Sequence, residues 1–251
     1  MAVALSFVGA AMVAGDSADC RGCLMSELLR VGAAPLAGLQ ARAVVASGDE
    51  ACWRRVSAAL PAVDAHPLDP ASDYAHKVAS LELPGLRVAV GLGSSFRFAV
   101  GDHALNTFLL SCGGRASVRQ GGACLHNSPE MPGLFLPGEA YRCEIRDAHG
   151  YVIATTPERL ALSALAMAEA SGLDGLDLSL LQRPMVVGPT HPSQAHVLAL
   201  LRSTLQLLDH QPSDGSLTAE ALELQQSSLV DVICRLLCAL MIPALIRREA
   251  S

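Results

Sequence analysis

Alternating apolar and polar positions dominate the middle of the chain. The clearest example is "SFRFAVGD", which places Phe96, Phe98 and Val100 on one face and Arg97 on the other. Between residue 63 and about residue 155, nine short segments of this kind are separated by Gly, Pro, Asp and Asn, and they predict an antiparallel barrel or sandwich. The segments are AVDAHPL, HKVASLEL, LRVAVGL, SFRFAVG, LNTFLLSC, ASVRQ, GLFLPG, YRCEIRD and YVIATT.

The pattern differs on both sides of this region. Before it, "ARAVVAS" from residue 41 predicts a short strand, and the Ser47 and Glu50 capping box predicts a helix to Leu60. After it, Thr156 is a plausible N-cap for a helix that begins at Pro157. Two longer helices are expected over residues 194–210 and 218–245.

The last predicted helix carries a wide apolar stripe at three-to-four-residue spacing. Such a stripe packs within the chain or contacts a second copy, and the two are compatible. If it forms a homodimer, the contact residues are expected to be Leu222, Leu229, Ile233, Leu236 and Leu240.

Composition limits the classes of partner. The chain has 251 residues, a formal net charge of −6 and a single lysine, Lys77, and no local cluster of basic residues is evident. We therefore expect no direct nucleic-acid binding by this chain. The N-terminal apolar run is too short to span a bilayer and has no preceding Lys or Arg, and charges interrupt the other apolar runs, so a cytoplasmic protein is expected rather than a membrane protein.

Candidate catalytic and metal-binding motifs are incomplete. "GLGSSF" lacks the order of a nucleophile elbow and the third glycine of a dinucleotide-binding turn. His126 has no His-x-His partner, Cys20 and Cys23 have no second pair, and Glu139 and Glu144 have no evident acid–base partner. We predict no catalytic residue, no metal site and no cofactor.

Taken in order, five segments resemble the sensor half of AraC-family transcriptional regulators. They are GDEACWRRVSAAL, LPGLRVAVGLGSS, LNTFLLSCGGRASVRQGG, MPGLFLPGEAYRCEI and YVIATTPERLALSAL. The resemblance implies an α+β fold with an antiparallel, cupin-like β-barrel of the jelly-roll type, preceded by a strand-helix unit and followed by a C-terminal helical hairpin. The expected regions are a poorly ordered or helical extension (1–40), strand-helix and barrel (41–156) and a helical dimerisation region (157–251).

In that family the barrel binds a small effector, the long helices dimerise, and a C-terminal pair of helix-turn-helix units reads DNA. This chain stops at "LIRREAS", where the family continues, so the DNA-binding domain is expected to be absent from it.

Residues that face the barrel interior are the candidates for effector binding. Alternation assigns the apolar candidates, and Arg97 is added as a polar handle beside Tyr141; a register slip of one residue would reverse the assignment. A solid barrel core is the alternative. The set is Phe96, Arg97, Phe98, Phe108, Leu110, Cys112, Tyr141 and Cys143.

These observations lead to three hypotheses. The first is a non-enzymatic, effector-sensing and dimerising module of an AraC-like regulator that lacks its DNA-binding domain. The second is a stand-alone cupin-like enzyme that acts on a small molecule, which the incomplete metal and acid–base motifs disfavour. The third is a structural partner protein, which would have a filled barrel without a cavity.

Overall fold

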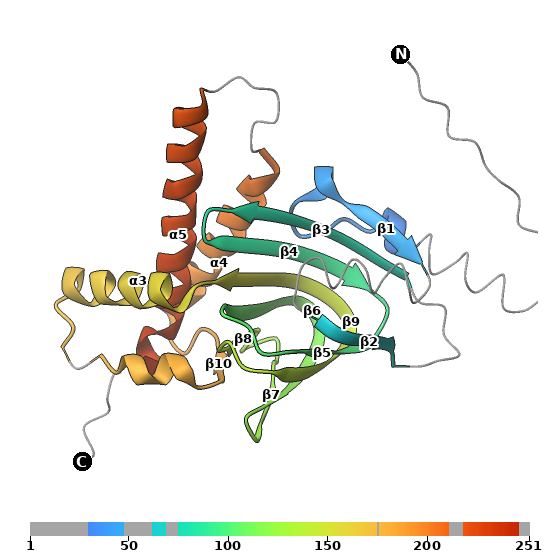
Figure 1. The fold of residues 1–251 in the computed structure, drawn as a ribbon, viewed down its shortest axis with the longest axis horizontal. Coiled ribbons are helices and arrows are strands. Elements are labelled where there is room, and N and C mark those ends of the chain that lie inside the picture. The colour runs from blue at the N-terminus through green and yellow to red at the C-terminus, as the bar shows by residue number, and fades with distance from the viewer. Residues whose placement is uncertain (1–29, 48–61, 69–74, 175, 211–217, 246–251) are drawn as a thin grey trace, which may run out of the picture.

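The fold is α+β, with a curled antiparallel sheet and helices gathered at one side of it (Figure 1). This computed structural model describes residues 30–47, 62–68, 75–174, 176–210 and 218–245. Within them the strands are β1 (Val44–Ser47), β2 (Ala62–Pro67), β3 (Ala75–Leu83), β4 (Leu86–Gly93), β5 (Phe96–Val100), β6 (Asn106–Gln120), β7 (Ala123–His126), β8 (Gly133–Leu136), β9 (Tyr141–Thr155) and β10 (Met185–Val187).

Two long strands, β6 and β9, form the central ribbon of the sheet. They pair with each other along almost their whole length, and each of their outer edges is shared by two shorter strands. On the β9 edge, β5 pairs with the first half and β4 with the second. On the β6 edge, β8 pairs with the first half and β7 with the second. The ribbon thereby divides the sheet into two arms that curl into a half-barrel (Figure 1).

A bulge bends this ribbon in the middle. The register between β6 and β9 shifts between Ser111 and Gly113 and again between Gly113 and Arg115. Gly114 has φ +76° at this point, and a Cβ there would collide with the carbonyl oxygen of Asp147, itself at φ +52°. An L side chain rarely adopts this conformation, so glycine is needed for the ribbon to bend here.

The bulge changes which side of the sheet each residue faces. Before it, Phe108 of β6 lies in the core against the helices, and beyond it Val118 lies in the interior of the curl, although both have even numbers. In β9 the odd-numbered Cys143 faces the interior, whereas Ile153 faces the helices. The two register shifts cancel, so each strand carries one inserted residue at the bulge. Because side chains alternate along a strand, that residue moves the following side chains to the opposite face.

The helices follow the sheet and cover its outer side. They are α3 (Pro157–Ala170), α4 (Pro192–Leu207) and α5 (Ala219–Leu245), with short 3-10 helices η1 (Gln40–Arg42), η2 (Leu178–Gln182) and η3 (Leu208–His210). Thr156 caps α3 by accepting a hydrogen bond from the Arg159 N–H, with Pro157 at the first helical position. In Figure 1, α3 crosses α5 and α4 runs alongside it.

One described helix, α5, is long and apolar enough to cross a membrane by length and composition, and 44% of its most apolar window is buried in the structure. After Glu223 it carries only two charged residues, Asp231 and Arg235. The expectation that charges interrupt every apolar run beyond the N-terminal segment is therefore wrong for α5. Its buried face, which includes Ile233 and Leu237, packs in the core with α3 and α4.

Residues near the N-terminal end of the described chain are fastened to β3 by Lys77. Lys77 is 4% exposed, and its ammonium donates hydrogen bonds to the carbonyl oxygens of Gly32 (3.1 Å) and Ala34 (2.8 Å). Leu36 and Leu39 then enter the helix-side core. Part of the segment expected to be an extension thus contributes to the core.

Most elements agree with the expectations from the sequence. Strands were predicted at β1 to β6, β8 and β9, and the helix starts at Pro157 and near residue 218 are confirmed. Four of the predicted strands are halves of two longer ones: LNTFLLSC and ASVRQ belong to β6, and YRCEIRD and YVIATT belong to β9. The two strands stay paired on both sides of the bulge, so neither strand ends there. The short strands β7 and β10 were not predicted, and the helix expected after Ser47, as far as Leu60, lies outside the described residues.

Candidate functional site

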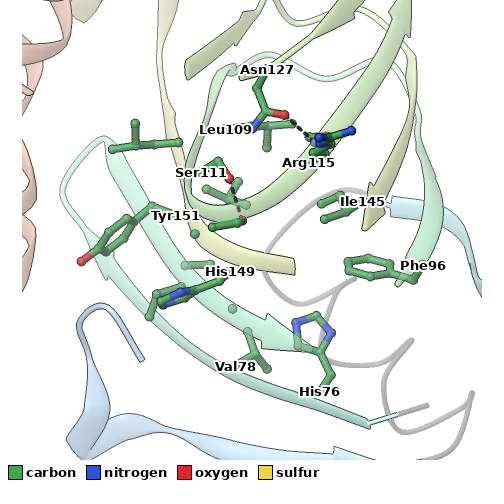
Figure 2. A pocket seen from close by; sticks show the side chains of 18 of the residues that line it. His76, Val78, Phe96, Leu109, Ser111, Arg115, Asn127, Ile145, His149 and Tyr151 are labelled. Atoms are coloured by element: carbon green, nitrogen blue, oxygen red, sulfur yellow. Dashed lines mark hydrogen bonds between the residues drawn. The ribbon is translucent and has the colours of Figure 1, made fainter. Parts of the chain in front are cut away.

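A pocket with about 90 Å³ of free space lies inside the curl of the sheet, against β3, β4, β5, β6 and β9 (Figure 2). Its walls are mostly apolar. Leu109, Val152 and Ala89 contribute from three adjacent strands, which is possible because β4, β9 and β6 pair in register there. The polar groups at the wall are His76, Ser111, Arg115, Asn127 and His149.

His76 forms one end of the pocket. Its ring is 5% exposed and tilts against Phe96 at 5.2 Å between ring centroids. A Cβ on Gly91 would lie 2.8 Å from Nε2 of His76, so a glycine in β4 makes the space for the imidazole. Burial lowers the pKa of His76 to about 4, because the protonated ring would be poorly solvated there. The imidazole is therefore neutral at physiological pH.

His149 offers the pocket an unused polar atom. Its Nε2 is buried and has no hydrogen-bond partner among the described residues, although the residue as a whole is half-buried. Burial also lowers the pKa of His149, so its ring is neutral near pH 7. A buried nitrogen without a partner costs free energy, which a ligand or a bound water would recover.

The bulge forms the opposite wall and is held by polar contacts. Oδ1 of Asn127 accepts a hydrogen bond from the Ala116 N–H at 2.5 Å, and Oγ of Ser111 donates to the Gly113 carbonyl at 2.8 Å. From α4, the Arg202 guanidinium donates to the Ser111 carbonyl at 3.1 Å. The same bulge that bends the sheet thus gives the pocket polar groups, and it connects the pocket to α4.

Tyr151 closes the side that faces the N-terminal segment (Figure 2). It is 2% exposed, and its hydroxyl donates to the Ala37 carbonyl at 2.5 Å. Burial, with the nearby Cys112 and Asp209 as further causes, raises the pKa of Tyr151. The phenol is therefore neutral and already paired, and it acts as a wall.

The bulge divides the predicted effector-binding residues between the two sides of the sheet. Phe96, Phe98 and Leu110 line the pocket. Phe108 packs on Phe135 at 5.1 Å in the helix-side core, and Cys112 packs against the same core.

The remaining predicted residues lie away from the pocket lining. Tyr141 and Cys143 are buried in the interior cluster beyond the bulge, and burial raises both pKa values. Tyr141 contacts Phe98 edge-on at 6.1 Å between ring centroids. Arg97 is exposed on the outer face of β5.

Sequence reasoning missed both histidines of the pocket. His76 is separated from His149 by more than 70 residues, and neither belongs to a motif. A local signal existed only for His76, which stands in an alternating strand segment opposite the glycines of "VGLG". His126, which the sequence analysis considered for a metal, is exposed on β7, with Nε2 3.4 Å from the sulfur of Cys124. Among the described residues, no three His, Cys, Asp or Glu residues form a group that could hold a metal ion.

The residues predicted for a dimer contact differ in exposure. Ile233 (0%) and Leu240 (6%) are buried within the chain. Leu229 and Leu236 are half-buried against the same core, and Leu222 is half-buried nearer the start of α5. The most exposed large apolar residue of α5 is Leu224, at 70%.

The fold is similar to that of a solved transcriptional regulator. The AraC-like transcriptional activator CuxR superposes on 83% of this chain and 73% of its own, with a TM-score of 0.55 and 15% sequence identity. At that identity the likeness shows a shared fold. It does not by itself show a shared ligand or activity.

Other similarities are weaker. A Vibrio parahaemolyticus protein of unknown function, VPA0057, matches 36% of this chain and 95% of its own at 15% identity, with a TM-score of 0.26. KdgF from Halomonas sp. matches 36% of this chain and 82% of its own at 12% identity, with a TM-score of 0.24. Scores this low carry no argument about the chain. No family model and no curated protein matches the sequence.

Proposed function

We propose that this chain is the effector-binding module of an AraC-like transcription regulator and that it binds a small molecule in the pocket inside the curled sheet. The observation that carries the proposal is this mostly apolar pocket, with an unpaired His149 Nε2 in its wall, in a fold shared with an AraC-like activator. Ligand pockets commonly combine apolar walls with a few polar groups that fix orientation. The five sequence segments that follow one another in the same order as in the sensor half of AraC-family regulators support the same function.

The pocket restricts the chemistry of the effector. Its buried histidines are neutral, so a strongly charged group would lose hydration without a buried counter-charge. The free space of about 90 Å³ is smaller than the cavity of roughly 150 Å³ that holds benzene in an engineered protein. The expected effector therefore inserts a small apolar group beside one hydrogen-bonding atom, and any larger part extends past Arg115 into solvent.

The bulge supplies a route by which occupancy of the pocket would reach the helices. Ser111 lines the pocket, and its carbonyl accepts the hydrogen bond of Arg202 on α4. A ligand that shifts the bulge would change the hydrogen bond between the Ser111 carbonyl and Arg202, which joins the pocket wall to α4. This contact would couple effector binding to the helical layer, provided that the bulge has two discrete arrangements and the ligand favours one of them.

A pair of matched probes tests the pocket. Isopropanol and propane share an apolar group smaller than benzene, but only isopropanol has a hydroxyl for His149. We expect methyl resonances of Leu109 and Val152 to shift on titration in the NMR spectrum, with isopropanol bound several-fold more tightly. The Ala89→Leu variant should abolish both shifts by filling the pocket, whereas Ala166→Leu, on an exposed position of α3, should leave them intact. Shifts that persist in Ala89→Leu, or that never appear, would reject the pocket as the binding site.

Dimerisation belongs to the same proposal. Exposed leucines stand on α4 at positions 200 and 207 and on α5 at position 224, and Leu229 and Leu236 of α5 are half-buried. We propose that a homodimer forms through these leucines and that the module is a soluble cytoplasmic protein. Sedimentation of Leu224→Glu should show a monomer where the parent chain shows a dimer, and Leu162→Glu, on α3, serves as the control. A parent chain that stays monomeric at high concentration would remove this part of the proposal.

A further inference from the structure

Five arginines gather on an exposed face of the curled sheet that the helices do not cover, and one of them, Arg115, also lines the pocket. Antiparallel neighbours that lie directly opposite each other project from the same face. Arg115 is opposite Arg146, and Arg119 is opposite Arg142, in the ribbon of β6 and β9. Arg97 lies on the adjacent strand β5, and all five side chains are exposed. The expectation that the chain has no local basic cluster is wrong, because residues distant in sequence are brought together by strand pairing.

This arrangement is unfavourable for the isolated protein. Like charges directly opposite each other destabilise a strand pair. The carboxylates on the same face are Asp64, which is paired with His66 at 2.6 Å, and Glu144, which lies between the two arginine pairs. None of the five arginines forms an ion pair among the described residues.

A hollow of about 420 Å³ lies at the Arg119–Arg142 pair. It is bounded by the turn that joins β6 to β7, by the start of β9 and by the end of β5. Its lining contains both arginines and no carboxylate, and Gly101, Gly121 and Gly122 place only backbone along part of its wall. Glu139 stands beside the turn but does not line the hollow.

From this geometry we propose a second binding site, in which Arg119 and Arg142 hold a phosphate group of a small phosphorylated ligand. The guanidinium group offers paired N–H donors that match the oxygens of a phosphate, and two guanidinium groups on opposite strands approach one anion from both sides. The second pair, Arg115 and Arg146, lies four residues further along each strand and attracts further negative charge on the same ligand.

A small ligand fits better than a nucleic acid. The chain carries a net charge of −6, which repels a polyanion at long range, whereas a small anion responds mainly to the local field. The hollow is also limited to one end of the ribbon. The hollow shares no lining residue with the effector pocket, although Arg115 of the second pair lies at that pocket's wall. Binding at Arg119 and Arg142 therefore stands or falls independently of the function proposed above.

The test uses the full chain with inorganic phosphate, pyrophosphate and tripolyphosphate as probes in calorimetric titrations at low ionic strength. We expect saturable binding that strengthens along this series. Arg119→Gln and Arg142→Gln should each weaken tripolyphosphate binding about tenfold, the loss of one charge-assisted contact. Arg142→Lys, which keeps the charge but not the paired donors, should lie between wild type and Arg142→Gln.

Controls separate the site from general charge and from misfolding. Arg183→Gln removes an exposed arginine elsewhere and should leave the affinity within twofold. Without phosphate, Arg142→Gln should melt at the same or a slightly higher temperature than wild type, because repulsion from Arg119 is relieved. Absence of binding to wild type, an equal loss in Arg183→Gln, or tighter arginine-dependent binding of a 12-base-pair DNA duplex than of tripolyphosphate would overturn the proposal.

Discussion

The two sides of the curled sheet are built differently. On the helix side, leucines, isoleucine and cysteines from α3, α4 and α5 form a continuous core, and buried polar groups such as Thr155 Oγ1 and Gln194 Nε2 donate to backbone carbonyls. The interior of the curl holds a smaller cluster and the pocket. Buried polar atoms that lack a hydrogen-bond partner among the described residues there include His149 Nε2 and Gln120 Oε1.

The difference indicates that the helix side mainly stabilises the fold, whereas the interior of the curl mainly serves binding. Close-packed apolar contacts on the helix side stabilise the fold. Unpaired polar atoms in the interior lower stability, and they are the groups through which a bound molecule can gain affinity. The helix side is not free of such atoms, since Arg202 Nε and Asp209 Oδ1 are also unpaired there. These two lie at the junction between the pocket and α4.

The largest expected effect comes from breaking the helix-side core. Leu201 on α4 is fully buried, and Leu201→Ala should lower the free energy of unfolding by about 4 kcal/mol. Leu109→Ala, at the pocket wall, should cost only about 2 kcal/mol, because that side chain already adjoins free space. Urea unfolding measures both, with the exposed Leu200→Ala as the control on the same helix. Equal costs for Leu201 and Leu109 would contradict the division between the two sides.

The buried histidine of the interior should make stability depend on pH. The folded-state pKa of His76 is about 4, whereas the unfolded chain takes up the proton near its ordinary value of 6.5. Between these values the unfolded state binds more protons, so the stability present above pH 6.5 falls as the pH decreases towards 4. The loss reaches at most about 3 kcal/mol.

Urea unfolding at pH 7.5 and pH 5.0 measures this loss. His76→Gln should make the difference between the two pH values smaller than in wild type. His149, whose pKa is also lowered, contributes in the same direction and remains in the variant. An unchanged difference would show that His76 takes up its proton normally in the folded chain.

A smaller effect on stability is expected at the bulge in β6 and β9, where the side chains change from one side of the sheet to the other. Gly114→Ala introduces a Cβ at positive φ against the Asp147 carbonyl and should destabilise by about 2 kcal/mol more than Gly122→Ala. Gly122 also has positive φ, but its Cβ would meet nothing within 4 Å. Differential scanning calorimetry of the two variants compares them. Similar melting temperatures would mean that the bulge adjusts without strain.

The smallest effect on stability is expected from a change at the surface of the helices. Arg159 and Asp231 form an ion pair between α3 and α5 at 3.1 Å, with side chains 31% and 58% exposed. Asp231→Asn should change stability by less than about 1 kcal/mol, and less still in 1 M salt. A larger or salt-independent loss would indicate that this contact orders the helices.

Local patterns in the sequence predicted most elements, since each depends on neighbouring residues. The Thr156–Pro157 helix start and the alternation in "SFRFAVG" are examples. The face that each residue occupies was harder to predict, because a one-residue bulge near Gly114 reverses alternation without a change in hydrophobic pattern. Phe108 and Phe98 were therefore assigned to one face, whereas they lie on opposite sides of the sheet.

Both candidate sites depend on strand pairing between distant segments. The pocket brings His76 of β3 near His149 of β9, and the outer face brings Arg119 of β6 opposite Arg142 of β9. Neither pair has a sequence spacing that identifies it. The sequence shows each of these residues singly. Which of them lie close together depends on the register of strand pairing, which a periodic pattern alone does not specify.

The burial of Lys77 has a practical consequence for spectroscopy. Its ammonium is the only lysine amine in the chain, and it is held by two backbone carbonyls. An amine-reactive dye should therefore leave Lys77 unmodified while the segment that contains Gly32 and Ala34 stays in place. Reaction of Lys77 itself would then serve as a clock for the opening of the segment that covers it.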